Sequence, residues 1–290
     1  MHVFESGGTR LVATVSGEAS SPLPPVLLIA GWPQSRLAWR RVIPPLVNAG
    51  RLVYALDPRG FGDSSTPSSG YDLSTVAGEI AEFIDSLGLT NRVELVGHDV
   101  GSWISHAVAV LTPDRIRSLA LIDAAIPGVM AEPNGYPNDA TNIRAWHFGL
   151  NRLPELPEIL MSGHEREYLE WSFRHKSTVP GSIEPEALDE YVRLFSDPAR
   201  KHAGFEYYRE VFSDTGRVEA LRRGSLPITV PMLTVGAAHS VGSLMYDTFT
   251  SLAADLEGIV LDCGHYVPEE RPRELVEALL SFWSRETKER

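Results

Sequence analysis

The sequence predicts an α/β protein in which a mostly parallel β-sheet is covered by helices and interrupted by a helical insertion. Short, continuous apolar runs alternate with amphipathic helical patterns through residues 1–126. The alternation stops over residues 127–221, which are rich in Pro, Trp and Tyr and show helical patterns only. Apolar runs return at residues 230–235 and 256–261. Alternating strands and helices build a parallel sheet with helices on both faces.

The expected elements follow from where apolar residues recur and where helix caps stand. Asp72 is a good helix cap, and Val76, Ile80 and Ile84 then fall on one helical face. Pro127 marks the end of the first set of strands, and a strand at 230–235 restores the sheet. The predicted strands are 26–30, 52–56, 93–96, 116–122, 230–235 and 256–261, and the predicted helices are 37–47, 72–87, 165–173, 185–195 and 273–283.

Length and composition limit the classes of protein that fit. A chain of 290 residues suits one large domain or a core with an inserted smaller one. We therefore expect a core domain at 1–126 and 222–290, and a helical cap domain at 127–221 over the active edge of the sheet. With 43% hydrophobic and 22% charged residues, the chain has the composition of an ordinary globular protein.

Charge and cysteine content bear on partners and compartment. The net charge of 26 − 38 = −12 argues against a nucleic-acid partner, because binding phosphate requires a basic face. The lone Cys263 excludes an intramolecular disulfide. The first residues show no signal-peptide pattern, and no apolar run approaches the ~20 residues of a membrane helix. These features predict a cytoplasmic protein without membrane contact.

A nucleophile-elbow pattern stands between a predicted strand and a predicted helix. Gly97-His98-Asp99-Val100-Gly101 has the form Gly-x-Asp-x-Gly, with Asp where lipases carry Ser. The turn is too tight for side chains beside the reacting residue, which explains the glycines. A carboxylate there attacks an sp³ carbon that bears a leaving group and forms an ester that water must cleave. Ser102 stands too far along the helix for a serine esterase.

A base and an orienting acid are expected at neighbouring strand ends. His265 lies in Gly264-His265-Tyr266-Val267-Pro268, in a loop at the carboxyl end of the sheet, where open α/β sheets bind ligands. The loop after residue 235 contains no carboxylate, whereas Asp123 ends the preceding strand and is the preferred acid. Asp262, close to His265 in sequence, is the second choice. A lone Gly-rich turn, a surface histidine and a turn-capping aspartate are the structural alternatives for these three positions.

These motifs resemble the epoxide hydrolase and dehalogenase branch of the α/β-hydrolase superfamily, over nearly the whole chain. The resemblance rests on Gly31-Trp32-Pro33-Gln34, Asp57-Pro58-Arg59-Gly60-Phe61-Gly62-Asp63-Ser64, the Gly-His-Asp elbow and Gly264-His265. It implies an α/β-hydrolase fold with a helical cap inserted after the sixth strand and an aspartate nucleophile. Members that take their acid from the strand after the nucleophile have it 24 positions on, and here 123 − 99 = 24.

The resemblance also assigns the remaining site residues. Related epoxide hydrolases hold the epoxide oxygen with two cap donors, and Trp146-His147-Phe148 and Phe205-Glu206-Tyr207-Tyr208-Arg209 match their motifs. His147 and Tyr208 are then the ring-opening pair, with Tyr207 as the adjacent competitor and ordinary helix packing as the alternative for both. The backbone N–H groups of Trp32 and Val100 would hold the oxyanion. Trp32, Trp146 and Tyr207 are expected to line the pocket.

The resemblance implies a hydrolase that opens a small-molecule epoxide to a vicinal diol with water, without a metal or organic cofactor. A dehalogenase with the same Asp-His-Asp residues is the alternative, although residues 100–104 contain neither the arginines of fluoroacetate-type enzymes nor the Trp of haloalkane enzymes. A non-catalytic ligand-binding protein is the third possibility, because Ala30 replaces the usual His of the oxyanion loop. The oligomeric state, monomer or homodimer, is left open.

Overall fold

The computed structural model describes residues 1–89, 92–131 and 137–286. Among these residues the chain forms one eight-stranded sheet in the order β1-β2-β4-β3-β5-β6-β7-β8. Strand β2 runs antiparallel to β1 and to β4, and the other neighbours are parallel. The strands are β1 (His2–Ser6), β2 (Thr9–Ser16), β3 (Val26–Ile29), β4 (Val53–Asp57), β5 (Val93–His98), β6 (Ile116–Ile122), β7 (Met232–Ala237) and β8 (Leu256–Leu261).

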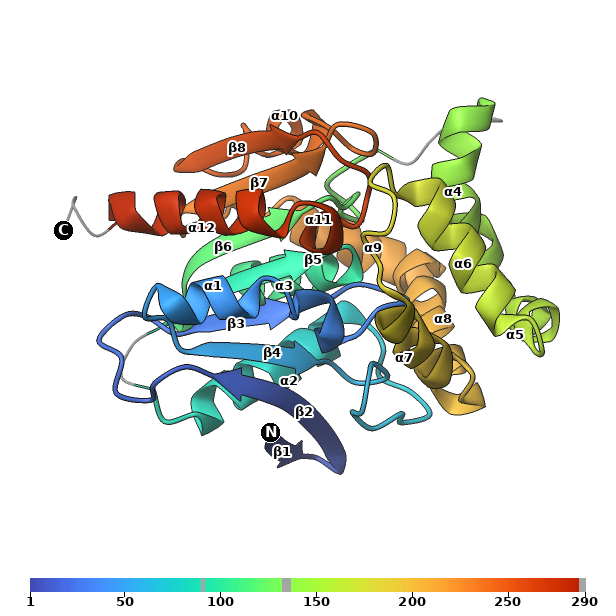
Figure 1. Ribbon diagram of the computed structural model, residues 1–290, viewed down its shortest axis with the longest axis horizontal. Helices are drawn as coiled ribbons and strands as arrows, with labels where there is room; N and C mark the ends of the chain where they lie inside the picture. The colour runs from blue at the N-terminus through green and yellow to red at the C-terminus, as the bar shows by residue number, and fades with distance from the viewer. Residues whose placement is uncertain (90–91, 132–136, 287–290) are drawn as a thin grey trace.

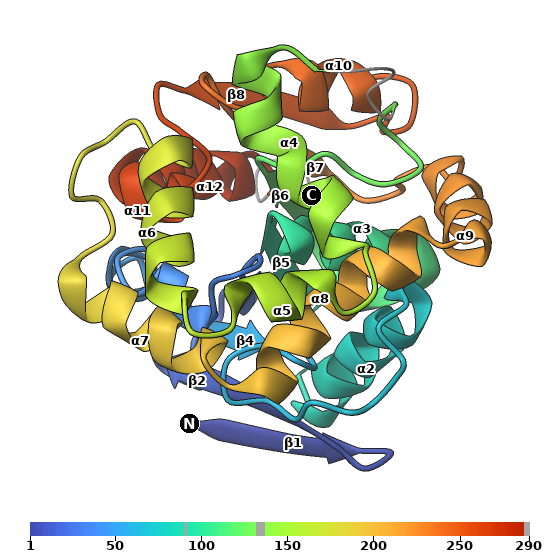
Figure 2. The same cartoon turned by 90° about the vertical axis from the view of Figure 1, so that its right-hand side faces the viewer.

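Helices cover both faces of the sheet and its carboxyl edge (Figure 1). Helices α1 and α12 pack on one face, and α2 and α3 on the other. Helices α4 to α8 surround the carboxyl ends of the strands (Figure 2). The helices are η1 (Arg36–Trp39), α1 (Ile43–Asn48), α2 (Leu73–Ser86), α3 (Val100–Leu111), η2 (Pro113–Arg115), α4 (Asp139–Asn151), α5 (Leu156–Met161), α6 (Glu165–Lys176), α7 (Pro185–Phe195), α8 (Pro198–Phe212), α9 (Asp214–Gly224), α10 (Leu244–Phe249), α11 (Val267–Glu270) and α12 (Pro272–Glu286).

The α/β-hydrolase fold predicted from the sequence is confirmed, and each predicted strand is present. The predicted helix at 72–87 is α2, and the Asp72 side chain accepts a hydrogen bond from the backbone N–H of Thr75. The prediction of one helix over 37–47 is wrong. The segment forms η1 and then α1, because Pro44 and Pro45 lack backbone N–H groups and are tolerated only in the first turn of a helix. The β1–β2 hairpin was not predicted.

Two hydrophobic clusters fix the helices on the sheet. Strand residues alternate between the two faces, so Leu27 and Ile29 contribute to one cluster and Val26 and Leu28 to the other. Strand β3 is completely buried, as its continuous apolar sequence predicts for a central parallel strand. The carboxyl ends of β3 to β8 therefore lie in a rigid frame, from which the following loops leave.

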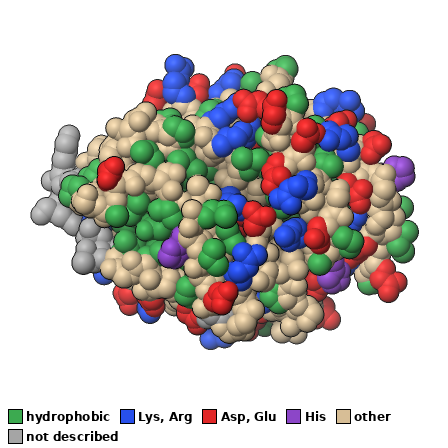
Figure 3. All heavy atoms as spheres, turned by 60° about the horizontal axis from the view of Figure 1, so that its bottom comes forward, with side chains coloured by type: hydrophobic (Ala, Val, Ile, Leu, Met, Phe, Trp, Pro, Cys, Tyr) green, Lys and Arg blue, Asp and Glu red, His purple; other side chains and the backbone are tan. Residues whose placement is uncertain are grey.

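The distribution of charge on the surface and the length of the helices bear on possible partners and membrane contact. On the face drawn in Figure 3, acidic and basic side chains of the described residues are intermixed beside a stretch of tan and hydrophobic atoms. Within the described part of the chain, no helix is both long and apolar enough to span a membrane.

Two glycine positions predict opposite effects of the same substitution. Gly78 is exposed in α2 and a Cβ there would meet nothing within 4 Å, so Gly78→Ala should raise the free energy of unfolding by ~0.5–1 kcal/mol. A Cβ on Gly101 would lie 2.2 Å from the backbone oxygen of Ile29, so Gly101→Ala should lower the free energy of unfolding. Urea unfolding measures the stability of both variants. Equal urea midpoints for Gly78→Ala and Gly101→Ala would contradict the close approach at Gly101.

Candidate active site

The candidate nucleophile stands in a strained turn between β5 and α3. Asp99 has φ 52° and ψ −122°, a backbone conformation that side chains rarely adopt. A Cβ on Gly97 would lie 2.3 Å from the backbone oxygen of Gly101, and a Cβ on Gly31 would lie 2.2 Å from Cβ of Asp99. The glycines of the motif are therefore required by close packing, and they leave the Asp99 carboxylate at the carboxyl edge of the sheet.

Asp123 and His265 complete a line of three groups with Asp99. His265 Nδ1 lies 2.7 Å from Asp123 Oδ2, and His265 Nε2 lies 3.4 Å from Asp99 Oδ2. The other oxygen of Asp123 accepts hydrogen bonds from the backbone N–H groups of Ala237, at 2.8 Å, and Val241, at 3.4 Å. The loop after β7 lacks a carboxylate of its own but fixes Asp123 with its amides. The second-choice acid, Asp262, is exposed and pairs with His239 instead.

The charges of this line are set by burial and by the two carboxylates. Burial disfavours the imidazolium form of His265, but hydrogen bonds and negative charge from Asp123 and Asp99 outweigh it and raise its pKa to about 9. Burial opposes ionisation of Asp99, yet the hydrogen bond and charge of His265 lower its pKa to about 2. The resting site is therefore an ion pair between an ionised Asp99 and a protonated His265 at neutral pH.

Backbone N–H groups face the Asp99 carboxylate where an oxyanion would form. The N–H of Trp32 donates to Asp99 Oδ1 at 2.9 Å. The N–H of Val100 also acts on this carboxyl group, lowering its pKa. The donor from Trp32 is present although the loop has a buried Ala30 in place of the His that the resemblance leads one to expect.

The two cap residues predicted from the resemblance lie together above the nucleophile. His147 on α4 and Tyr208 on α8 are buried, with ring centroids 5.9 Å apart, and both rings pack on the Trp32 indole. The Tyr208 hydroxyl makes no hydrogen bond of standard geometry with the described residues, and the side chain of Asn151 is a polar neighbour. Burial raises the pKa of Tyr208 well above its ordinary value, with the charge of Asp99 adding to the effect, so the hydroxyl keeps its proton.

Tyr207 contacts a different set of residues from Tyr208. Its hydroxyl donates to the backbone oxygen of Arg59 at 2.9 Å, and its ring packs against Phe61 and Tyr71. Adjacent helix residues point about 100° apart, so only one of Tyr207 and Tyr208 can face Asp99. Trp146 packs on His147, Tyr168 and Trp171, and its Nε1 has no partner among the described residues.

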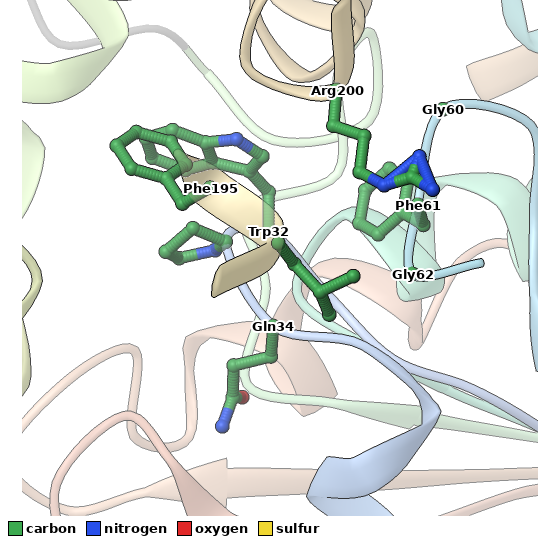
Figure 4. Close-up of a pocket in the computed structure, with 9 residues that line it drawn as sticks. Trp32, Gln34, Gly60, Phe61, Gly62, Phe195 and Arg200 are labelled. Atoms are coloured by element: carbon green, nitrogen blue, oxygen red, sulfur yellow. The ribbon is translucent and has the colours of Figure 1, made fainter. Parts of the chain in front are cut away.

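A small pocket lies beside the Trp32 indole, between the core loops and helices α7 and α8 (Figure 4). Gly60, Phe61 and Gly62 come from the loop after β4, and Arg200 from α8. The wall is completed by Pro33, Gln34, Leu194 and Phe195. Within the described residues no cluster of three or more His, Cys, Asp or Glu side chains could hold a metal ion.

Three polar residues near the site carried no motif and were not predicted. Lys176, the last residue of α6, places Nζ 3.1 Å from His147 Nδ1. Asn151, completely buried near Tyr208, makes no side-chain hydrogen bond among the described residues. Glu270 joins two loops that are distant in sequence. Its carboxylate accepts from the backbone N–H groups of Thr178, Val179, Gly264 and Tyr266 at 2.8 to 3.1 Å.

Comparison with known proteins agrees with the fold. A family model described as the alpha/beta hydrolase fold matches residues 24–223. The chain is 30% identical over 266 residues to a soluble epoxide hydrolase of Corynebacterium sp. (strain C12), with 90% of each chain covered. It is 28% identical over 297 residues to a fluoroacetate dehalogenase of Burkholderia sp., covering 97% of this chain and 95% of that one.

A solved structure of the epoxide hydrolase CorEH without ligand superposes with a TM-score of 0.86 and 28% identity over 98% of both chains. The protein belongs to the α/β-hydrolase family of hydrolytic enzymes.

Removing the candidate acid should change the titration of the base. In Asp123→Asn the pKa of His265 should fall by about 1 to 3 from its value of about 9, because one of two stabilising charges is lost. Asp262→Asn, which changes an exposed carboxylate paired with His239, should leave it unchanged. NMR titration of the histidine rings measures both variants. An unaltered His265 titration in Asp123→Asn would show that the 2.7 Å contact does not control the base.

Proposed function

We propose that the protein opens an epoxide to a vicinal diol with water, through a covalent ester on Asp99. The observation that carries the proposal is a carboxylate at the elbow that has His265 on one side and a buried Tyr208 hydroxyl near enough to feel the charge of Asp99. An ionised carboxylate is a nucleophile for ring carbon, and the oxygen released from the ring needs a proton or a strong hydrogen bond. His147 and Tyr208 would supply that bond.

The first half of the reaction forms the ester. An oxygen of Asp99 attacks a ring carbon, the C–O bond of the epoxide breaks, and the electron pair goes to the ring oxygen. The low pKa of Asp99, about 2, keeps the carboxylate ionised at any physiological pH. The resting His265 is protonated, which prevents it from acting as a base before the ester exists.

The second half hydrolyses the ester. Ester formation removes the charge of Asp99, one of the two charges that raise the pKa of His265. The pKa then falls, His265 releases its proton to solvent, and the neutral imidazole takes a proton from water while Asp123 holds Nδ1. The amides of Trp32 and Val100 would stabilise the oxyanion on the Asp99 carbonyl. As that intermediate collapses, the remaining proton of the attacking water passes to the departing oxygen, which gives the diol and the Asp99 carboxylate.

Further features of the proposal come from the sequence. Residues 127–221 would form the cap domain over the core at 1–126 and 222–290, in a cytoplasmic enzyme whose partners are an epoxide and water. The dehalogenase alternative keeps the support of the fluoroacetate dehalogenase relative, but residues 100–104 offer no cation to a substrate carboxylate.

Replacing the base should trap the ester. His265→Gln exposed to a panel of epoxides and haloalkanes should gain the mass of a whole epoxide, because the ester forms but water is no longer activated. The same adduct should be absent from Asp99→Ala/His265→Gln. Intact-protein mass spectrometry reads both. A gain equal to a haloalkane minus hydrogen halide would make the enzyme a dehalogenase, and no adduct from the panel would contradict the proposal.

The two adjacent tyrosines provide a matched pair of variants. Tyr208→Phe removes the free hydroxyl and should slow ester formation in the His265→Gln background by about 10²–10³-fold. Tyr207→Phe removes the hydrogen bond to Arg59 and should lower the free energy of unfolding by ~1 kcal/mol while ester formation continues. Time-resolved mass spectrometry gives the rates. Slow ester formation in the Tyr207 variant and a normal rate in the Tyr208 variant would reverse the assignment.

A further inference from the structure

Lys176 connects the candidate ring-opening histidine of the cap with the candidate base of the core. Its Nζ lies 3.1 Å from Nδ1 of His147, and its backbone oxygen accepts a hydrogen bond from the N–H of His265 at 2.8 Å. The side chain is partly buried at the end of α6, facing away from the solvent-exposed Arg174 of the same helical turn. Neither the elbow motif nor the Trp-His-Phe motif includes this residue.

The contact determines which nitrogen of His147 carries a proton. Burial lowers the pKa of His147 well below its ordinary value, and the charge of Lys176 adds to this, so the ring is neutral. A neutral imidazole has one N–H donor and one bare acceptor nitrogen, whereas an ammonium group can only donate. Nδ1 must therefore accept from Lys176, and the ring proton must be on Nε2.

A competing arrangement is available in the same helix. The backbone oxygen of Arg144, one turn before His147 on α4, acts as a hydrogen-bond acceptor for the ring. If Nδ1 carried the proton and donated to that oxygen, Nε2 would be a bare acceptor and would repel the oxygen of an opening epoxide. The Lys176 ammonium group excludes this arrangement because it has no lone pair to offer Nδ1–H.

We propose that Lys176 is a positioning residue for ring opening, which keeps the His147 proton on Nε2 and supplies a replacement proton through Nδ1. This inference rests on the proposed epoxide hydrolysis. As the Asp99–carbon bond forms and the carbon–oxygen bond breaks, the ring oxygen takes the Nε2 proton and Nδ1 takes one from Lys176. The lysine is left as a neutral amine. It regains, through solvent, the proton that His265 releases when ester formation lowers the pKa of the imidazole, and the hydrolytic water later protonates His265 again.

The charges around Lys176 suit this transfer. Burial lowers the pKa of Lys176 to about 8, and the negative charges of Asp99 and Asp123 oppose the shift. Among the described residues, His147, His265 and Tyr208 also face this region. Ester formation removes the charge of Asp99, which lowers the pKa of Lys176 further at the moment when the ring oxygen needs a proton. Above about pH 8 the neutral amine can accept from Nδ1–H, so ester formation should slow as the pH rises through this value.

The tautomer of His147 is measured on the resting protein, without any substrate. In the wild-type chain labelled with ¹⁵N-histidine, long-range ¹H–¹⁵N spectra should show a protonated Nε2 and a bare Nδ1, assigned by the signal lost in His147→Gln. Lys176→Met should move the proton to Nδ1 or give a mixture, and Lys176→Arg should restore the wild-type pattern. Arg174→Met, a matched loss of charge on the same helix, should change nothing. An unchanged tautomer in Lys176→Met overturns the proposal.

The rate of ester formation is the second readout, measured in the His265→Gln background by intact mass. Lys176→Met should form the ester about 10–100-fold more slowly and lose the decline above about pH 8, with Lys176→Arg in between. The hydrogen bond from the N–H of residue 265 to the backbone oxygen of residue 176 persists in every side-chain variant. A variant that was slow only because it was destabilised would also show a lower unfolding midpoint. A shifted tautomer with an unchanged rate overturns the role in ring opening. Absence of any adduct in His265→Gln itself refutes the epoxide hydrolase proposal, while the tautomer still decides the Lys176–His147 coupling.

Discussion

The strained turn at Asp99 is the constraint on which the rest of the site depends. Its left-handed backbone, φ 52°, is stable only because β3 and α3 approach it so closely that Gly31 and Gly101 leave no room for a Cβ. The same approach brings the Trp32 amide to 2.9 Å from the carboxylate. Packing of buried strands and helices thus stores the strain that exposes the nucleophile, and the oxyanion donor is a product of that packing.

The electrostatics of the site follow from two carboxylates sharing one imidazole. Asp123 is fixed by amides of the loop after β7, and Asp99 is fixed by the elbow, so His265 is held between them at 2.7 Å and 3.4 Å. In the proposed reaction Asp99 loses its charge when the ester forms, whereas Asp123 keeps its charge. The base therefore changes its proton affinity during the cycle without any movement of the chain, because only the charge of its neighbour changes.

The sequence predicted the sheet and the line from Asp99 through His265 to Asp123, because glycines and strand ends constrain these positions locally. It did not predict the break at Pro44, where missing N–H groups override helical periodicity. It also left Tyr207 and Tyr208 undecided, since both are aromatic and the choice depends on which face of α8 packs against the core. The β1–β2 hairpin was missed although Leu11, Val12 and Ala13 of β2 are buried, because polar residues flank this three-residue apolar run. Contacts between distant segments, such as the lysine beside His147, carry no signature in sequence.

The Glu270 carboxylate has a consequence for the movement of the helices around the site. It binds amides of the segment between α6 and α7 and of the loop that contains the base, so these two parts of the chain are fastened to each other. Charge-assisted hydrogen bonds of this kind are strong, and any separation of the two segments would have to break all of them. The carboxyl end of α6 therefore stays beside the loop of His265 when other parts of the helical layer move.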